Sequence, residues 1–130
     1  MDFYPILGKE FNLEINMSDD LFIKIINREI PADIIYETDD ILAFRDINPQ
    51  APVHVLIIPK QQIRTINDLK SKHGEIMGKL FLVAAELAER EGIADEGYRV
   101  VMNCNEAGGQ AVYHIHLHLL GGRQMGWPPG

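Results

Sequence analysis

The 130-residue sequence has little cysteine and little basic charge. Cys104 is its only cysteine, and 12 basic residues stand against 19 acidic ones, which gives a formal net charge of −7. A single cysteine excludes an intrachain disulfide and suits a reducing compartment. The acidic balance argues against binding to nucleic acid, which needs a basic surface. It does not exclude a small nucleotide, because main-chain N–H groups and imidazoles can hold one phosphate.

Long apolar runs are also missing. No stretch approaches the length that spans a membrane, and no basic start followed by an apolar segment indicates a targeting signal. We therefore expect a cytoplasmic protein that does not bind membranes. With 46% hydrophobic and 24% charged residues, the composition is typical of a globular domain. The length allows one such domain but not two.

The first sixteen residues fit poorly with the remainder. Residues 1–16 show no clear periodicity, whereas Met17 begins a stretch that can cap a helix. We expect residues 1–16 to be an N-terminal extension, either disordered or not native; the alternative is a short arm that packs on the domain. The domain covers residues 17–130 and ends in an irregular tail, residues 121–130. An exposed Trp127 in this tail would be unusual, so we expect it to dock on another surface, such as a second subunit.

Hydrophobic periodicity predicts an α+β fold. Apolar residues recur at helical spacing from Leu21, and that helix should end before Pro31. A longer helix should extend from about residue 72 or 73 to Glu91, with Gly92 as its C-terminal cap. Short β-prone runs predict an antiparallel sheet with the helices on one side. The expected strands are residues 34–37, 41–46, 53–58, 98–103 and 112–120.

Three histidines alternate with aliphatic residues near the C-terminus. His114, His116 and His118 are separated by Ile115 and Leu117. Such alternation predicts a β-strand, in which the imidazoles line one face and the aliphatic groups line the other. Stacked titratable groups are costly unless something uses them, so the pattern indicates a functional site.

Two glycines precede this triad and favour an anion as its ligand. Gly108 and Gly109 allow unusual backbone dihedrals and bring bare N–H groups close to whatever the histidines face. His54 also lies on a predicted strand, which is entered through a turn with two prolines. His73, on the flank of the predicted long helix, should be a solvent-exposed surface residue.

The residue types alone allow three alternatives. The histidines form a metal site, they form a catalytic or anion site, or they have neither role. Zinc favours imidazole ligands, but no cysteine pair and no obvious acidic ligand accompanies the triad. The glycine turn is better suited to an oxyanion. We therefore favour the anion and expect no metal and no cofactor, with a zinc-binding protein as the weaker alternative.

The triad resembles the His-x-His-x-His-x-x pattern of the histidine-triad superfamily. Gly108-Gly109-Gln110 before it and Gly121-Gly122-Arg123-Gln124-Met125-Gly126-Trp127-Pro128-Pro129-Gly130 after it resemble more narrowly the Hint branch, the histidine-triad nucleotide-binding proteins. The resemblance covers residues 21–130. It implies a five-stranded antiparallel sheet with two helices, paired into a homodimer whose sheets join. It also implies metal-independent hydrolysis of AMP-linked amines in a purine nucleotide pocket, with AMP or GMP as the nucleotide.

The resemblance also implies roles for single residues. His116 resembles the nucleophile that attacks the α-phosphorus, and a neighbouring histidine can protonate the leaving amine and later take a proton from water. His54 and His114 resemble supporting histidines of the same imidazole network. Asp46 resembles the acceptor for the ribose hydroxyls. His118, Asn103 and the N–H of Gly109 resemble the phosphate-binding groups, with Gln110 and Ala111 beside them. The apolar walls of the base pocket are Leu21, Phe22, Ile25, Phe44 and Ile47, and Trp127 resembles a tail residue that reaches toward the partner subunit's site.

One position departs from the branch. Ala111 stands where the branch often carries a serine whose hydroxyl lies near the scissile nitrogen. Phosphate binding through the main chain should persist, but help to the leaving group comes into doubt. The alternative function is therefore a nucleotide-binding or scaffold module with weak or vestigial hydrolysis.

Overall fold

The computed structural model describes residues 20–130, so the expected extension at residues 1–16 and the start at Met17 lie outside the described part. The chain is helical over residues 20–26. The elements that follow are β1 (Ile34–Glu37), β2 (Ile41–Arg45), β3 (Val53–Pro59), the 3-10 turns η2 (Ile66–Asp68) and η3 (Ser71–His73), α2 (Gly74–Arg90), β4 (Tyr98–Val101) and β5 (Leu117–Gly121).

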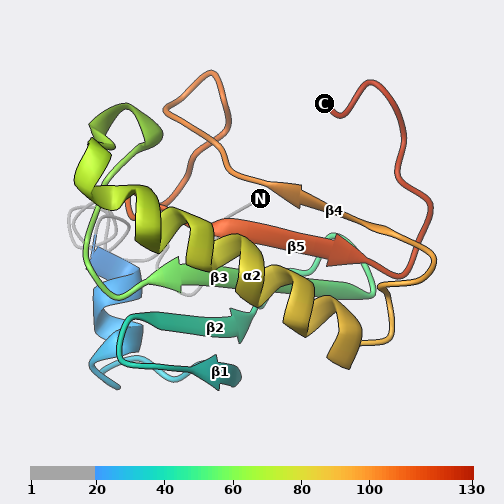
Figure 1. Cartoon of the computed structure of the whole chain (residues 1–130), viewed down its shortest axis with the longest axis horizontal. Coiled ribbons are helices and arrows are strands. Elements are labelled where there is room, and N and C mark those ends of the chain that lie inside the picture. The colour runs from blue at the N-terminus through green and yellow to red at the C-terminus, as the bar shows by residue number, and fades with distance from the viewer. Residues whose placement is uncertain (1–19) are drawn as a thin grey trace, which may run out of the picture.

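The five strands form one antiparallel sheet in the order β1-β2-β3-β5-β4 (Figure 1). The prediction of an antiparallel sheet in an α+β fold is confirmed. The central strand β3 pairs with β2 on one side and with β5 on the other. In this register His54 lies opposite Leu120, and His118 lies opposite Leu56. The central pair therefore carries two of the predicted site histidines on adjacent strands.

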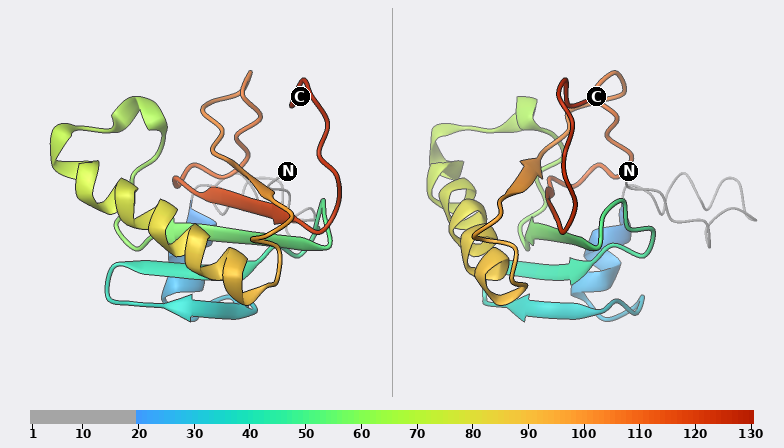
Figure 2. Two further views of the ribbon diagram at one scale, coloured as in Figure 1. Left: turned by 45° about the vertical axis from the view of Figure 1, so that its right-hand side comes forward. Right: turned by 90° about the vertical axis from the view of Figure 1, so that its right-hand side faces the viewer.

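The helices cover opposite faces of the sheet, and the expectation that they share one side is wrong. In the right-hand view of Figure 2, the sheet lies between α2 and the short helix of residues 20–26. The physical reason is that β2 and β3 are buried on both faces, so each face needs a cover. The core under α2 includes Ile41, Ala43, Val55, Ile57, Leu117 and Leu119, and the core under the short helix includes Leu21, Phe22, Ile25, Leu42, Phe44, Leu56 and Ile58.

The long helix has the bounds that its periodicity predicts, to within two residues. Its buried stripe consists of Leu80, Val83, Ala84, Leu87 and Ala88. Gly92 follows the helix with a φ of +74°, a left-handed conformation that suits glycine at a helix C-terminus. The cap prediction is therefore confirmed.

The last strand is shorter than expected, and two triad histidines lie outside it. The prediction placed a strand over residues 112–120, but β5 begins only at Leu117. Before that point the N–H of Ile115 donates to the carbonyl of Ile63, 2.7 Å away, so this segment pairs with a loop instead of a sheet neighbour. Alternation nevertheless holds, because Ile115 and Leu117 belong to the α2-side core.

The edges of the sheet differ. The register between β1 and β2 shifts between Ile34 and Tyr36, an irregularity that interrupts β1, whereas β4 pairs regularly with β5. The C-terminal tail follows β5, and Arg99 of β4 fixes it by donating to the carbonyl of Gly126 at 2.7 Å. Among residues 20–130, no helix is both long and apolar enough to cross a membrane.

Candidate active site

The four predicted site histidines come together on the face of the sheet that the short helix covers. His54 and His118 project from β3 and β5, and all four rings are buried. The ring of Phe22, from the short helix, packs edge-on against His116 with centroids 5.0 Å apart and against His114 at 5.8 Å. The site is thus assembled from two neighbouring strands, the segment before β5 and one helix.

His116 has a defined tautomer. Its Nδ1 lies 2.7 Å from the carbonyl oxygen of His114. A carbonyl oxygen only accepts, so Nδ1 must carry the proton and donate it. In the neutral ring Nε2 then holds the lone pair, which is the requirement for a nucleophilic imidazole.

His114 is a neutral structural histidine. Its Nε2 lies 2.7 Å from the carbonyl oxygen of Pro59 and, by the same argument, donates to it. Burial lowers the pKa of His114 to about 4, and the nearby ring of His116 acts in the same direction, while the bond to Pro59 opposes the shift. The ring is therefore uncharged at neutral pH, and it ties the segment before β5 to the end of β3.

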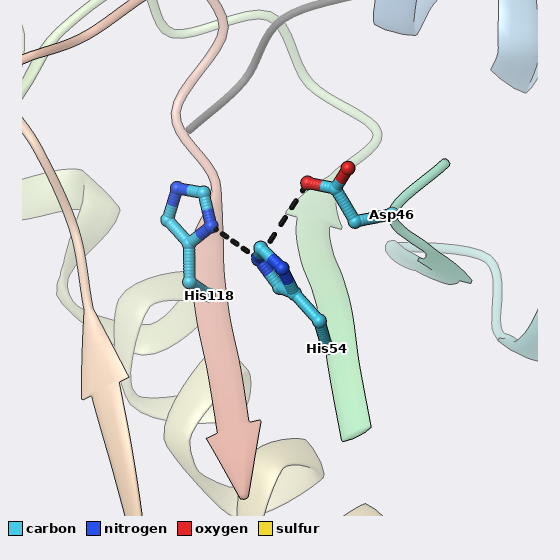
Figure 3. Close-up of side chains that lie close together, drawn as sticks. All are labelled: Asp46, His54 and His118. Carbon is cyan, nitrogen blue, oxygen red and sulfur yellow. Dashed lines mark hydrogen bonds and ion pairs between the residues drawn. The ribbon is translucent and has the colours of Figure 1, made fainter. Parts of the chain in front are cut away.

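Asp46, His54 and His118 lie close together, with a hydrogen bond between the two histidines and a close contact from His54 to the carboxylate (Figure 3). His54 Nε2 lies 2.9 Å from His118 Nδ1 and 3.5 Å from Asp46 Oδ2. The other ring nitrogen of His54 accepts from the main-chain N–H of Gln50 at 3.0 Å. Asp46 Oδ1 accepts from the N–H of Asn48 at 2.8 Å. The predicted ribose acceptor therefore adjoins the imidazole network directly.

An ion pair holds the end of β2, directly before Asp46. Arg45 donates from Nη1 and Nη2 to the two carboxylate oxygens of Glu91, at 2.8 and 3.0 Å. This two-pronged pair links β2 to the C-terminal end of α2. The hydrogen bond from Arg45 also lowers the pKa of Glu91, so the pair stays charged at neutral pH.

Asp46, His54 and His118 offer three ligand atoms within 4.8 Å of one another. As placed, however, they do not fit a metal ion. The nitrogens of His54 and His118 that face each other share one proton in a hydrogen bond, whereas a metal needs a lone pair from each ligand. The arrangement is that of a hydrogen-bonded histidine pair beside a carboxylate.

The glycine loop is closed by a main-chain turn. Gly109 has a φ of +86°, and its N–H donates to the carbonyl of Glu106 at 2.9 Å. This N–H, predicted to bind phosphate, is therefore engaged in a turn. The side chain of Gln110, also predicted to lie beside the nucleotide, is buried and bonds main-chain groups of Asn105, Arg64 and Val112 instead. Gln110 thus shapes the loop from within, because its amide supplies one acceptor and two donors to main-chain groups.

The predicted apolar walls separate into two groups. Four are buried together in the core under the short helix: Leu21, Phe22, Ile25 and Phe44. Ile47 is instead 51% exposed. Asn103 is half-buried after β4, Ala111 is half-buried in the loop, and Trp127 in the tail is 83% exposed.

The prediction for His73 is wrong. His73 is buried, and its Nδ1 accepts from the N–H of Lys70 at 2.9 Å, so the ring closes the turn that precedes α2. Sequence reasoning also missed two main-chain partners of the site, the N–H of Gln50 and the carbonyl of Pro59. Gln50 lies in the turn before β3 and Pro59 is the last residue of β3, and a proline marks each boundary of that strand. These prolines are the only sequence signal for the two main-chain partners.

Comparisons with known proteins agree with this geometry. A HIT domain family model matches residues 27–125. Purine nucleoside phosphoramidase of Escherichia coli (strain K12) is 58% identical over 106 residues, 82% of this chain and 89% of that protein. Adenylylsulfatase HINT1 of Arabidopsis thaliana is 48% identical over 126 residues, 94% of this chain and 85% of that protein.

A solved structure agrees as well. The crystal structure of a HIT family hydrolase from Legionella pneumophila Philadelphia 1 has a TM-score of 0.83 and 58% identity, and the match covers 85% of this chain and 98% of that one. The family match spans most of the chain, and the relatives align over nearly their whole length. This chain belongs to the HIT domain family.

Proposed function

We propose that the protein is a purine nucleoside phosphoramidate hydrolase that cleaves the P–N bond of AMP-linked amines. The observation that carries the proposal is the tautomer of His116, whose Nδ1 donates to the His114 carbonyl and so leaves the lone pair on Nε2. The 58% identity to a purine nucleoside phosphoramidase supports the substrate class. Adenosine is the proposed nucleoside, with guanosine as the other purine.

In the first step, Nε2 of His116 attacks the α-phosphorus. A P–N bond to the histidine forms, the P–N bond to the amine breaks, and the amine nitrogen takes up a proton as it leaves. Water then attacks the phosphorus, releases AMP and restores the neutral ring. Developing charge on the phosphoryl oxygens is stabilised by N–H donors, for which His118 is the proposed side chain.

Asp46 is the proposed ribose acceptor. Its carboxylate is buried next to His54, with one oxygen bound to the N–H of Asn48. Two vicinal hydroxyls can share such a carboxylate, so ribonucleotides are preferred to deoxyribonucleotides. Asn103, Ala111 and the base-pocket residues named above are proposed to line the remainder of the nucleotide site.

A second candidate is a nucleotide-binding or scaffold module with weak hydrolysis. Ala111 favours it, because this position lacks a hydroxyl that could assist the leaving amine. The two candidates differ in turnover but not in nucleotide binding, so they can be separated by one assay.

That assay measures AMP release from an adenosine 5′-phosphoramidate in EDTA for the wild type and His116→Ala. We expect metal-independent turnover that falls by about 10⁴-fold or more in the variant, because a covalent step is lost. His73→Asn is the matched control, since the asparagine oxygen can still accept from Lys70 and this histidine lies in the turn before α2. AMP binding without wild-type turnover would instead support the binding module, and Ala111→Ser would then be the next variant.

We also propose a homodimer formed through the β4 edge and a cytoplasmic location. The regular pairing of β4 and the exposed Tyr98 and Trp127 nearby support the dimer. Trp127 is proposed to reach toward the partner subunit's site. The single cysteine supports the location.

A further inference from the structure

We propose that His54 is a positioning residue that fixes which ring nitrogen of His118 carries the proton, with the main-chain N–H of Gln50 as its anchor. The inference deepens the proposed function and rests on it only for the effect on rate. Its structural part concerns hydrogen positions in the substrate-free protein.

The first step fixes the proton of His54. The N–H of Gln50 donates to His54 Nδ1 at 3.0 Å. A ring nitrogen that accepts an N–H carries no proton, so in the neutral ring the proton is on Nε2. Asp46 favours the same tautomer independently, because its Oδ2 lies 3.5 Å from Nε2 and a carboxylate oxygen attracts a donor. A main-chain N–H cannot change its role, which makes it a permanent anchor.

The second step transmits this choice to His118. His54 Nε2 lies 2.9 Å from His118 Nδ1, and both side chains are buried. Because His54 supplies the proton of this bond, His118 Nδ1 must accept and its own proton must be on Nε2. The opposite tautomer would bring two N–H groups together at 2.9 Å and forfeit a buried hydrogen bond. In Figure 3 the second nitrogen of His118 points away from His54.

The consequence is a donor that is ready before substrate binds. The ionisable groups around His118 in the described residues are the rings of His54 and His116 and, through His54, the carboxylate of Asp46. The pair is not a proton shuttle, because a proton passed from His54 to His118 would leave His54 with no ring proton. His118 therefore acts as a fixed N–H donor toward phosphate. A donor fixed in advance needs no reorganisation during the reaction.

Two substitutions at position 54 separate the hydrogen bond from Gln50 and the hydrogen bond to His118. In His54→Gln the amide nitrogen lies as many bonds from the main chain as Nε2 does, so it still donates to His118 but no longer anchors on Gln50. In His54→Asn the side-chain oxygen replaces Nδ1 and still accepts from Gln50, but the side chain is too short to donate to His118. The experiment records long-range ¹H–¹⁵N spectra of the histidine rings at about pH 8, above the usual pKa of histidine, together with kcat and KM.

We expect His118 in the wild type and in His54→Gln to be protonated at Nε2 alone. His54→Asn should show a mixture of tautomers, and its kcat should fall roughly 100-fold with little change in KM, the loss expected when one fixed donor is removed. A merely structural role for His54 would not change the tautomer of His118. The rescue by glutamine would also be missing in that case.

Two results would overturn the inference: a wild-type His118 protonated at Nδ1, or a His54→Asn protein with the wild-type tautomer and rate. The spectra need no substrate, so they decide the hydrogen positions even if the wild type does not hydrolyse phosphoramidates. If a variant does not fold, its main-chain spectrum shows this, and the wild-type spectrum alone then confirms or contradicts the tautomer.

Discussion

At the scale of single residues, His114 shows how burial keeps an imidazole uncharged. Its ring donates to the Pro59 carbonyl from Nε2, and burial lowers its pKa to about 4. In the unfolded chain the same ring takes up a proton at about pH 6.5. Above that pH the ring is neutral in both the folded and the unfolded chain, so it does not change the free energy of unfolding. Between pH 6.5 and pH 4 the ring is protonated in the unfolded chain but not in the folded chain. The free energy of unfolding therefore falls as the pH is lowered through this range.

This difference predicts a pH-dependent stability that one substitution should remove. His114→Gln keeps a side-chain N–H at the position of Nε2 and does not titrate. Between pH 7 and pH 4.5, the wild type should lose about 2 to 3 kcal/mol more unfolding free energy than this variant. Urea unfolding at the two pH values measures the difference. Equal losses in both proteins would show that His114 is protonated as easily in the folded state as in the unfolded one.

At the scale of elements, one side-chain amide links the loop before β5 to a second segment. The side chain of Gln110 accepts from the N–H of Asn105 at 2.8 Å and donates to the carbonyls of Arg64 and Val112 at 2.8 and 3.1 Å. Three main-chain groups from two segments are thus satisfied by one side chain. Main-chain groups that are buried without a partner are costly.

Gln110→Ala should therefore destabilise the fold by about 2 kcal/mol or more, because these groups lose their partners together. Chemical unfolding at pH 7 measures the change. Gln124→Ala is the matched control, since Gln124 is exposed and its side-chain amide donates to the neighbouring carbonyl of Met125. If the two variants lose the same free energy, the loop does not depend on Gln110.

The elements also show what the sequence could predict. Periodicity located α2 and all five strands, and the resemblance brought His54, Asp46 and the triad into one site, as the structure does. Alternation alone could not show that His114 and His116 precede β5, because a loop that packs flat on the core alternates as a strand does. Likewise, the burial of His73 and the inward turn of Gln110 come from hydrogen bonds to main-chain atoms, which leave no pattern in side-chain hydrophobicity.

At the scale of the whole molecule, the two edges of the sheet suggest where a second copy would bind. β1 is interrupted by a register shift, a feature that protects an edge strand, whereas β4 pairs regularly over its length. α2 carries two exposed apolar residues, Phe81 and Leu82. Leu82 lines a surface groove with residues of β1 and β2, so Phe81, about 100° further round the helix, faces away from that edge.

The proposed dimer therefore predicts different results for two adjacent substitutions. Phe81→Lys should weaken dimerisation by about tenfold or more, since a charge would be buried on the β4 side of α2. Leu82→Lys should leave the dimer unchanged, because it lies on the side of β1. Sedimentation velocity over a range of concentrations measures both, and a monomeric wild type would contradict the dimer outright.

The exposed tail has an optical consequence. Trp127 is the only tryptophan in the sequence, and 83% of it is exposed. The indole fluorescence of the protein therefore comes from one ring, and in the monomer its emission should resemble that of a solvated indole. Any event that covers the tail should shift this emission to shorter wavelength and reduce quenching by iodide. The protein thus carries its own fluorophore for titrating tail contacts, without a label.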